Sequence, residues 1–330
     1  MKQVLNKLIN HEHLDYVQAR QVLIDISNGA YNQSQIAAFL TVYMMRNIAL
    51  DELSGFRDAL MELCVRVDLD EFDTIDLCGT GGDGKNTFNI STLAAFVTAG
   101  ASIKVTKHGN YGVSSVSGSS NVLEHLGIRF SNKQDYLRKC LDKAGICILH
   151  APLFHPAMKS VAPIRRELGV KTFFNMLGPM VNPASPKNQL VGVFNLELAR
   201  MYHYLYQNNS TTYSIVHALD GYDEISLTGP ARILSRSSEQ LLQPSDLVTN
   251  PLLQRDLYGG RTVEEAAKLF GDILKGKGTR AQQDVVCANA GLAIATFEQC
   301  DIKEGFEKAK ESLRSGKALK SFESLQKLSE

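Results

Sequence analysis

The sequence predicts an α/β protein with a small all-α N-terminal domain and a larger domain built on a mainly parallel central sheet covered by helices. Three observations predict this fold class. Residues 2–64 read as helices throughout, short β-branched runs alternate with helical stretches from Thr74 onward, and a glycine-dense turn follows the first of those runs. Alternating strands and helices are typical of a parallel sheet with helices on its faces.

The N-terminal stretch carries start and stop signals for short helices. Asp15 with Gln18, and Asn32 with Gln35, are combinations of an N-cap residue and its N3 partner, and Gly29 suits the end of the helix between them. The apolar faces of these helices exceed what three short helices need among themselves. Two explanations stay open, packing on the main domain or a dimer interface, and we predict a homodimer that forms through this helical domain.

Domain boundaries are expected where the composition shifts. Residues 1–65 form the helical domain, the acidic stretch 66–73 is a hinge, and residues 74–330 form the α/β domain. Strands are expected at 74–77, 103–107, 146–150, 189–194, 213–218 and 231–235. Helices are expected at 92–100, 120–126, 134–144, 196–207, 263–274, 281–297 and 302–315. In such a sheet, ligands bind beyond the carboxyl ends of the strands.

Composition narrows the class of partner. A formal net charge of zero argues against a broad nucleic-acid-binding surface. No apolar run reaches the roughly 18–20 residues of a membrane helix, and the N-terminus lacks a signal-peptide pattern. The six cysteines are scattered without a CxxC pair, which favours a reduced cytoplasm over a disulfide framework or a zinc site. The pairs His11/His13 and His150/His155 lack carboxylates at metal-binding spacing. We therefore expect a cytoplasmic protein whose partners are small molecules, with neither nucleic acid nor membrane among them.

The glycine-dense turn lies in the stretch Thr74–Thr92, TIDLCGTGGDGKNTFNIST. Its four glycines, at positions 79, 81, 82 and 84, suit backbone with positive φ or close to a ligand. A strand before the turn and an Ala-rich helix after it would leave amide N–H groups at the positive end of a helix dipole, which suits a phosphate. The spacing matches neither a Walker loop nor a dinucleotide fingerprint. The alternatives are an ordinary tight turn and simple capping of the helix by a Ser or Thr side chain.

A second polar loop follows the next expected strand. Lys107, His108, Gly109 and Asn110 come at the carboxyl end of that strand, and a Ser/Gly-rich run continues to Asn121. Serines alone would fit a flexible surface loop. A Lys-His-Gly-Asn group at the same sheet edge as the first loop is better explained by a shared ligand. Two anion-suited loops on consecutive strand ends predict a ligand with two phosphate groups.

Charged residues farther along the chain complete this interpretation. Asp223 and Glu224 follow the strand 213–218, and paired carboxylates would repel a phosphate unless a cation lies between them. Mg²⁺ bridging carboxylate and diphosphate oxygens is the usual solution, and an exposed acidic turn is the alternative. Arg165 and Arg166 are either solvated charges or the side chains best shaped to hold a carboxylate.

Four motifs together resemble one known family. GTGGDGKNTFNIST, KHGNYGVSSVSGSSNVLEHLG, RRELGVKTFFNMLGPMVNP and GYDEIS, in this order and spacing, are similar to the anthranilate phosphoribosyltransferases of tryptophan biosynthesis. The resemblance covers essentially the whole chain. It implies transfer of phosphoribose from 5-phosphoribosyl 1-diphosphate (PRPP) to the amine of anthranilate, with release of diphosphate. It also implies a requirement for Mg²⁺, expected as two ions, and a homodimer whose small domain includes a second segment at about 165–185.

The family's site residues can be placed by motif. The resemblance implies PRPP contacts from Gly79, Gly82, Asp83, Thr87, Asn89, Ile90, Ser91, Thr92, Lys107, His108, Gly109, Asn110, Tyr111, Gly112, Val113, Ser114, Ser115 and Ser119. Ser91, Asp223 and Glu224 would hold the metal. Gly79, Asn110 and Arg165 would meet anthranilate, with Arg165 facing its carboxylate. The expected catalytic residues are His108, Asn110 and Arg165, and His108 either manages the amine proton or only orients the loop or stacks on anthranilate.

Two positions depart from the family pattern, and two other functions compete. Tyr111 stands where the family commonly has Arg, and Asn121 where it commonly has Asp, so one phosphate is expected to be held less electrostatically. A pyrimidine nucleoside phosphorylase shares the KHGN motif but carries an extra C-terminal domain and lacks the FNMLGPMVNP run. A non-catalytic nucleic-acid-binding relative would be expected to show a basic groove and to lose the carboxylates at 223 and 224.

Overall fold

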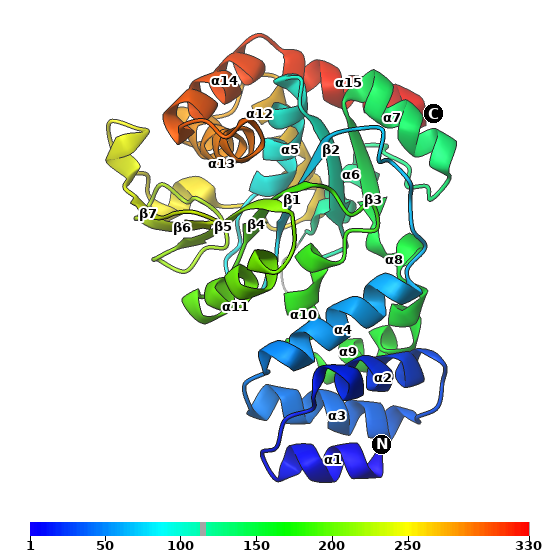
Figure 1. The fold of residues 1–330 in the computed structure, drawn as a ribbon. Helices are drawn as coiled ribbons and strands as arrows, with labels where there is room; N and C mark the ends of the chain where they lie inside the picture. Colours follow the sequence, from blue (N-terminus) through cyan, green and yellow to red (C-terminus); the bar gives the residue numbers. More distant parts are fainter. Residues whose placement is uncertain (113–116, 330) are drawn as a thin grey trace. The chain divides into compact units, whose positions relative to one another are not determined.

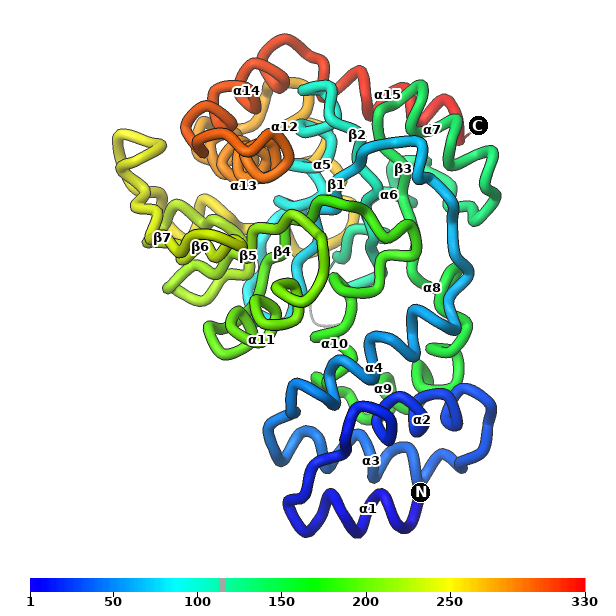
Figure 2. Tube along the Cα trace, in the orientation of Figure 1, coloured from blue at the N-terminus to red at the C-terminus, as the bar shows by residue number. Residues whose placement is uncertain are grey.

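The computed structural model describes residues 1–112 and 117–329. It divides into two compact units, one formed by Met1–Val67 and Ala151–Ser185, the other by Asp68–His150 and Pro186–Glu330. The first unit is helical and the second is α/β (Figures 1 and 2). The helical unit therefore takes a longer second segment than the 165–185 that the resemblance implied. None of the helices in the described ranges combines the length and apolarity that a membrane span requires.

The helical unit begins with four helices from the N-terminal segment. They are α1 Lys2–Ile9, α2 Tyr16–Ser27, α3 Gln33–Met45 and α4 Leu50–Leu63. The capping boxes of Asp15 with Gln18 and of Asn32 with Gln35 are confirmed, and Gly29 follows α2 with a φ of +73°. The sequence signals for these helix ends are therefore the ones the chain uses.

The second segment supplies short helical pieces to the same unit. They are α8 Ala151–Phe154, η1 Pro156–Ser160, α9 Ala162–Leu168, α10 Phe174–Leu177 and η2 Gly178–Met180. Its Phe173 ring stacks on Phe56 at 4.6 Å between centroids and meets Phe39 edge-on at 6.0 Å. Aromatic pairs of this kind add to the stability that burial provides, so the two segments share one core.

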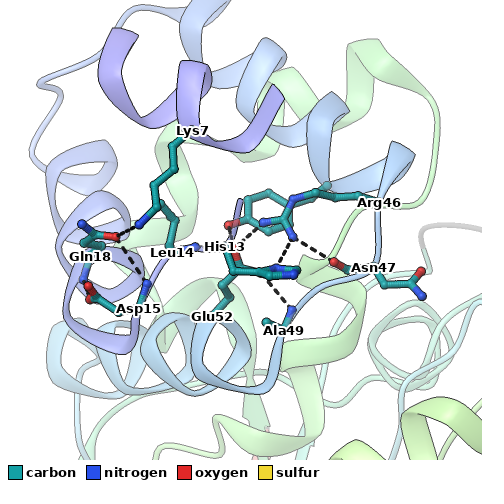
Figure 3. Close-up of polar contacts among 10 residues, drawn as sticks. Lys7, His13, Leu14, Asp15, Gln18, Arg46, Asn47, Ala49 and Glu52 are labelled. Atoms are coloured by element: carbon teal, nitrogen blue, oxygen red, sulfur yellow. Dashed lines mark hydrogen bonds and ion pairs between the residues drawn. The ribbon is translucent and has the colours of Figure 1, made fainter. Parts of the chain in front are cut away.

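A buried carboxylate ties the N-terminal helices together. Glu52 is fully buried and accepts from the backbone amides of Leu14 and Ala49, at 2.9 and 2.8 Å, and from Arg46 (Figure 3). Burial by itself raises the pKa of Glu52, but these donors outweigh it and lower the pKa below the usual value. The ionised carboxylate thus fixes the connection before α2 against the turn that starts α4.

The α/β unit is built on one seven-stranded sheet in the order β3-β2-β1-β4-β5-β6-β7. Its strands are β1 Thr74–Gly79, β2 Lys104–Gly109, β3 Ile146–His150, β4 Asn188–Gly192, β5 Thr212–Ala218, β6 Ala231–Ser235 and β7 Glu239–Leu242. The pairs from β3 to β5 are parallel, and β6 and β7 add an antiparallel edge. The predicted mainly parallel sheet is confirmed, whereas β7 was not foreseen.

Helices cover this sheet (Figure 1). They are α5 Ile90–Gly100, α6 Ser119–His125, α7 Gln134–Ala144, α11 Leu196–Gln207, α12 Val263–Leu274, α13 Arg280–Glu298, α14 Ile302–Arg314 and α15 Lys317–Ser329, with short turns η3 Pro244–Asp246 and η4 Gln254–Leu257. Helix α5 is buried almost from end to end, because α13, α14 and α15 pack around it. The sequence prediction stopped before α15, although its apolar residues at 318, 322 and 325 repeat at helical spacing.

Candidate active site

The carboxyl ends of β1 and β4 lie side by side at the centre of the sheet. Their register pairs Gly79 with Gly192. From β1 the strand order runs outward through β2 and β3 on one side and through β4 and β5 on the other. Reversal of strand order at such a point leaves a crevice at the strand ends, which is where α/β proteins bind ligands. The first predicted loop starts here.

The glycine loop turns through left-handed backbone before α5. Gly81, Gly82 and Gly84 have φ values of +61°, +77° and +75°, a conformation that favours glycine. Helix α5 then begins at Ile90, and its N-cap residue, Asn89, makes no side-chain capping bond. The loop is thus more than a capped helix start, because its glycines are required by the backbone path.

Two amides, one in this loop and one in the first turn of α5, donate to carboxylates. The Gly81 amide donates to Asp223 Oδ2 at 2.7 Å, and the Ser91 amide donates to Glu224 Oε1 at 3.2 Å. Asp223 is 7% exposed, so the exposed acidic turn that the sequence left open is not what the chain forms. The acidic pair therefore lies against the first loop, as a shared site requires.

The ionised form of both carboxylates is disfavoured by their surroundings. Burial, together with the neighbouring Asp83 carboxylate, raises the pKa of Asp223 to about 7. Burial and the charges of Asp223 and Asp83 also raise the pKa of Glu224 well above its usual value. Within the described part of the chain, Glu224 Oε2 is buried without a hydrogen-bond partner. An oxygen-only donor set that needs positive charge fits a hard divalent cation such as Mg²⁺.

The second loop starts at the end of β2, next to β1. Lys107 is buried, and its Nζ donates to the Leu77 carbonyl at 2.6 Å, so the cation lies under the loop rather than in solvent. The amide of His108 donates to Asp76 Oδ1 at 3.1 Å, and the His108 side chain is buried as well. Asn110 is exposed, and its carbonyl accepts from the Ser119 hydroxyl at 3.2 Å.

The two unusual residues of this loop both have partners in the fold. Asn121 Oδ1 accepts from the amides of Gly112 and Gly118, at 2.9 and 3.0 Å, and so joins the two ends of the Ser-rich run. The Tyr111 ring meets His150 edge-on at 4.8 Å. Each departure thus has a structural role in shaping the loop.

The other residues predicted to contact PRPP make contacts within the fold or lie buried in α5. Asn89 Nδ2 donates to the Ser117 carbonyl at 3.2 Å, which brings the two loops together. Ile90 and Thr92 are buried in α5, and the Ile90 amide donates to the Phe88 carbonyl at 2.6 Å. Thr87 forms an isolated bridge with Tyr258, and the Asp83 carboxylate accepts from the Lys85 amide at 3.0 Å. Val113, Ser114 and Ser115 lie outside the described residues.

Two residues at this site were not found from the sequence. A Cβ atom on Gly192 would lie 1.6 Å from the Asp223 carbonyl oxygen, so only glycine fits there. Asn289 on α13 bonds the backbone of Ile225, two residues after Asp223. The available signals were a glycine between valines at the end of a strand and one Asn in a long apolar run.

Arg165 belongs to the helical unit. It lies on α9, its guanidinium donates to Asn175 Oδ1 at 3.1 Å, and it sits over the Phe174 ring at 5.4 Å. Burial lowers its pKa from the usual value, and no described carboxylate pairs with it. The neighbouring Arg166 is exposed. Of the two arginines, Arg165 is therefore the one whose side chain the fold holds in place.

Comparison with known proteins identifies the family. Residues 2–64 match the model for the helical bundle domain of a glycosyl transferase family, and residues 71–319 match its a/b domain. A protein of Flavobacterium psychrophilum named anthranilate phosphoribosyltransferase is 67% identical over 329 residues, covering 100% of both chains. The chain belongs to the anthranilate phosphoribosyltransferase family. The namesake from Bacteroides fragilis is 52% identical over 96% of both chains.

Solved structures of this family share the fold. The anthranilate phosphoribosyltransferase of Thermus thermophilus aligns with a TM-score of 0.90 at 32% identity, covering 98% of each chain. The Saccharomyces cerevisiae enzyme in complex with PRPP and Mg aligns with a TM-score of 0.90 at 26% identity, over 98% of this chain and 96% of that one. The same yeast enzyme has also been solved with 4-fluoroanthranilate.

Proposed function

We propose that this chain transfers the 5-phosphoribosyl group from PRPP to the amine of anthranilate, a step of tryptophan biosynthesis. The nitrogen–C1 bond forms, the bond between C1 and the diphosphate oxygen breaks, and the amine loses a proton. The observation that carries this proposal is the pair Asp223 and Glu224, buried beside the glycine loop at the strand-order switch. The yeast relative solved with PRPP and Mg supports it.

Departure of diphosphate is the demanding part of this reaction, because negative charge grows on the leaving group. When bound, Mg²⁺ would neutralise part of that charge. Asp223, Glu224 and Ser91 are the residues proposed to hold it, and the unpartnered Glu224 Oε2 offers one ligand atom. Preorganised donors aimed at developing charge are usually the largest source of acceleration. The glycine loop and the loop from Lys107 onward are the proposed donors to PRPP.

Anthranilate needs little activation, because an aryl amine is already neutral at pH 7. Positioning it behind C1 supplies the rest of the acceleration and leads to inversion at that carbon. We propose that Arg165 anchors the anthranilate carboxylate and that Asn110 and Gly79 approach the ring and amine. The hydrogen bond to Asn175 already orders the Arg165 guanidinium, which lowers the entropy cost of fixing this side chain when a ligand binds. His108 is proposed either to take the amine proton or to orient its loop.

We also propose a homodimer formed by the helical unit. Ile9, Val17 and Met45 expose 61%, 68% and 81% of their surface, on α1, α2 and α3. Large apolar side chains in solvent are typical of an interaction surface when they gather. We expect wild-type protein to elute as a dimer in light scattering coupled to gel filtration, and Met45→Glu to shift it toward monomer. A monomeric wild type would contradict the dimer. A cytoplasmic location remains a prediction.

The activity is tested by mixing the protein with PRPP, Mg²⁺ and anthranilate and following the loss of anthranilate fluorescence. We expect loss that requires all three components. Omitting Mg²⁺ or replacing PRPP by ribose 5-phosphate serves as the matched control. Consumption of a pyrimidine nucleoside and phosphate, with none of anthranilate, would overturn the proposal.

A further inference from the structure

The loop that carries Asp223 and Glu224 spans residues 219–230 and is closed at its base. It connects β5 to β6, and the Leu219 amide donates to the Pro230 carbonyl at 2.8 Å. Inside it, Asp220 accepts from the hydroxyls of Ser226 and Thr228. These bonds hold the base of the loop and the side chains of Ser226 and Thr228, but none of them reaches the backbone of Ile225, the residue directly after the two carboxylates.

Asn289 holds that segment from the neighbouring helix. Its Oδ1 accepts from the Ile225 amide at 2.9 Å, and its Nδ2 donates to the Ile225 carbonyl at 2.9 Å. Nδ2 also donates to the Val285 carbonyl, one turn back on α13, at 2.9 Å. Asn289 is 3% exposed and Ile225 is 1% exposed, so water does not compete for these bonds.

The carboxamide is well matched to this task. Ile225 lies outside any strand, so its buried N–H and C=O need partners that a side chain must supply. A carboxamide offers a donor and an acceptor side by side, as a neighbouring peptide group does in a sheet. Aspartate would place oxygens against two carbonyls, and alanine would leave both backbone groups of Ile225 unpaired.

The loop has almost no freedom on its other side. A Cβ atom on Gly79 would lie 2.4 Å from Asp223 Oδ2, and one on Gly192 would lie 1.6 Å from the Asp223 carbonyl oxygen. The ends of β1 and β4 thus pack directly against Asp223, while Asn289 of α13 hydrogen-bonds with the Ile225 backbone. The backbone that carries the two carboxylates is therefore in contact on both sides.

We propose that Asn289 is a positioning residue for the metal-binding carboxylates: it sets the place of Asp223 and Glu224 through Ile225, without touching the metal or the substrate. The proposal rests on the function proposed above. Residues that orient metal ligands typically change metal affinity about 10–100-fold when they are replaced. A residue that only satisfies buried polar groups would change stability and leave metal affinity alone.

The test compares Asn289→Ala with a matched control on the same helix. Thr296 is 6% exposed, and its hydroxyl donates to the Leu292 carbonyl and hydrogen-bonds with the Ser214 hydroxyl, both at 2.7 Å, so Thr296→Val removes buried hydrogen bonds away from the carboxylate loop. Asn289→Ser, which retains a small polar group, serves if Asn289→Ala does not fold. Full-length proteins are titrated with Mn²⁺ in the presence of inorganic diphosphate, and free Mn²⁺ is measured by electron paramagnetic resonance. Hydrogen exchange of the peptide 219–228 is measured without metal.

We expect Asn289→Ala to weaken Mn²⁺ binding at least about 10-fold and to speed exchange in this peptide. Asn289→Ser should shift both in the same direction. Thr296→Val should change Mn²⁺ binding less than about 2-fold and leave the peptide's exchange as in wild type. Equal Mn²⁺ binding in wild type and the Asn289 variants would overturn the positioning role, whether or not exchange in the peptide changes. A wild type that consumes no anthranilate would overturn the proposed function instead, and the comparison of Mn²⁺ binding would still decide the role of Asn289.

Discussion

Adding a single methyl group at Gly192 should disable the site. The Cβ of Gly192→Ala would lie 1.6 Å from the Asp223 carbonyl oxygen and 2.8 Å from its carbon, and real Cβ atoms essentially never approach below 3.0 Å. The Asp223 carbonyl oxygen must therefore move away by about 1.4 Å, the difference between the 3.0 Å limit and the 1.6 Å approach. Displacements of about 1 Å in a catalytic constellation cost about 100-fold in rate. We expect kcat to fall by at least that factor.

The assay is steady-state turnover of anthranilate at saturating PRPP, with Mg²⁺ varied. Gly271→Ala is the matched control, because Gly271 lies on α12 with nothing within 4 Å of an added Cβ. Alanine replaces glycine there at a helix position, so this variant should keep full activity and gain about 0.5–1 kcal/mol of stability. Overpacking should cost Gly192→Ala about 1–3 kcal/mol, which still leaves folded protein to assay. Wild-type kcat and Mg²⁺ dependence in Gly192→Ala would refute the reasoning.

Three further changes test separate parts of the site. Asp223→Asn should lower turnover and weaken the dependence on Mg²⁺, whereas Asp70→Asn, an exposed control, should not; an unchanged Mg²⁺ titration would remove Asp223 from the metal site. Arg165→Ala should raise KM for anthranilate far more than for PRPP, with exposed Arg166→Ala as control, and equal losses for both substrates would contradict a selective carboxylate anchor. Burial lowers the pKa of His150 to about 4, so the unfolded chain binds more protons between about pH 6.5 and 4, and stability falls as the pH falls through that window. Between pH 7 and pH 4.5, the free energy of unfolding measured in urea should fall about 2.5 kcal/mol less for His150→Gln than for wild type. An equal fall in both proteins would contradict a buried neutral histidine.

Local chemistry allowed much of the fold to be predicted. The capping boxes of α2 and α3 depend on residues three positions apart, so the sequence contains the whole interaction. Strand β7 was missed because it exposes three of its four residues and lacks a β-branched side chain. Its strand conformation depends on pairing with β6, where Glu239 of β7 forms an ion pair with Arg232 of β6 at 2.7 Å.

Site residues whose type suits a ligand could be predicted from the sequence. Site residues that are needed for packing against other parts of the site could not. The glycine loop, the loop from Lys107 and the acidic pair could each be found, because their residue types suit phosphate or metal. Gly192 and Asn289 could not, because their roles come from contacts with Asp223 and Ile225 that no local pattern encodes. Lys107 was predicted at the ligand from its position after a strand, whereas the hydrogen bond of its Nζ to the Leu77 carbonyl depends on β2 lying beside β1, which no local pattern encodes.

The central claim is that this chain joins anthranilate to phosphoribose at a Mg²⁺-dependent site. The most direct measurement identifies the product of a reaction containing the protein, PRPP, Mg²⁺ and anthranilate by mass spectrometry, with diphosphate release quantified in parallel. We predict one N-(5-phosphoribosyl)anthranilate formed for each diphosphate released, and neither without Mg²⁺. Diphosphate release with no anthranilate adduct, or product formation that is equal with and without Mg²⁺, would contradict the claim.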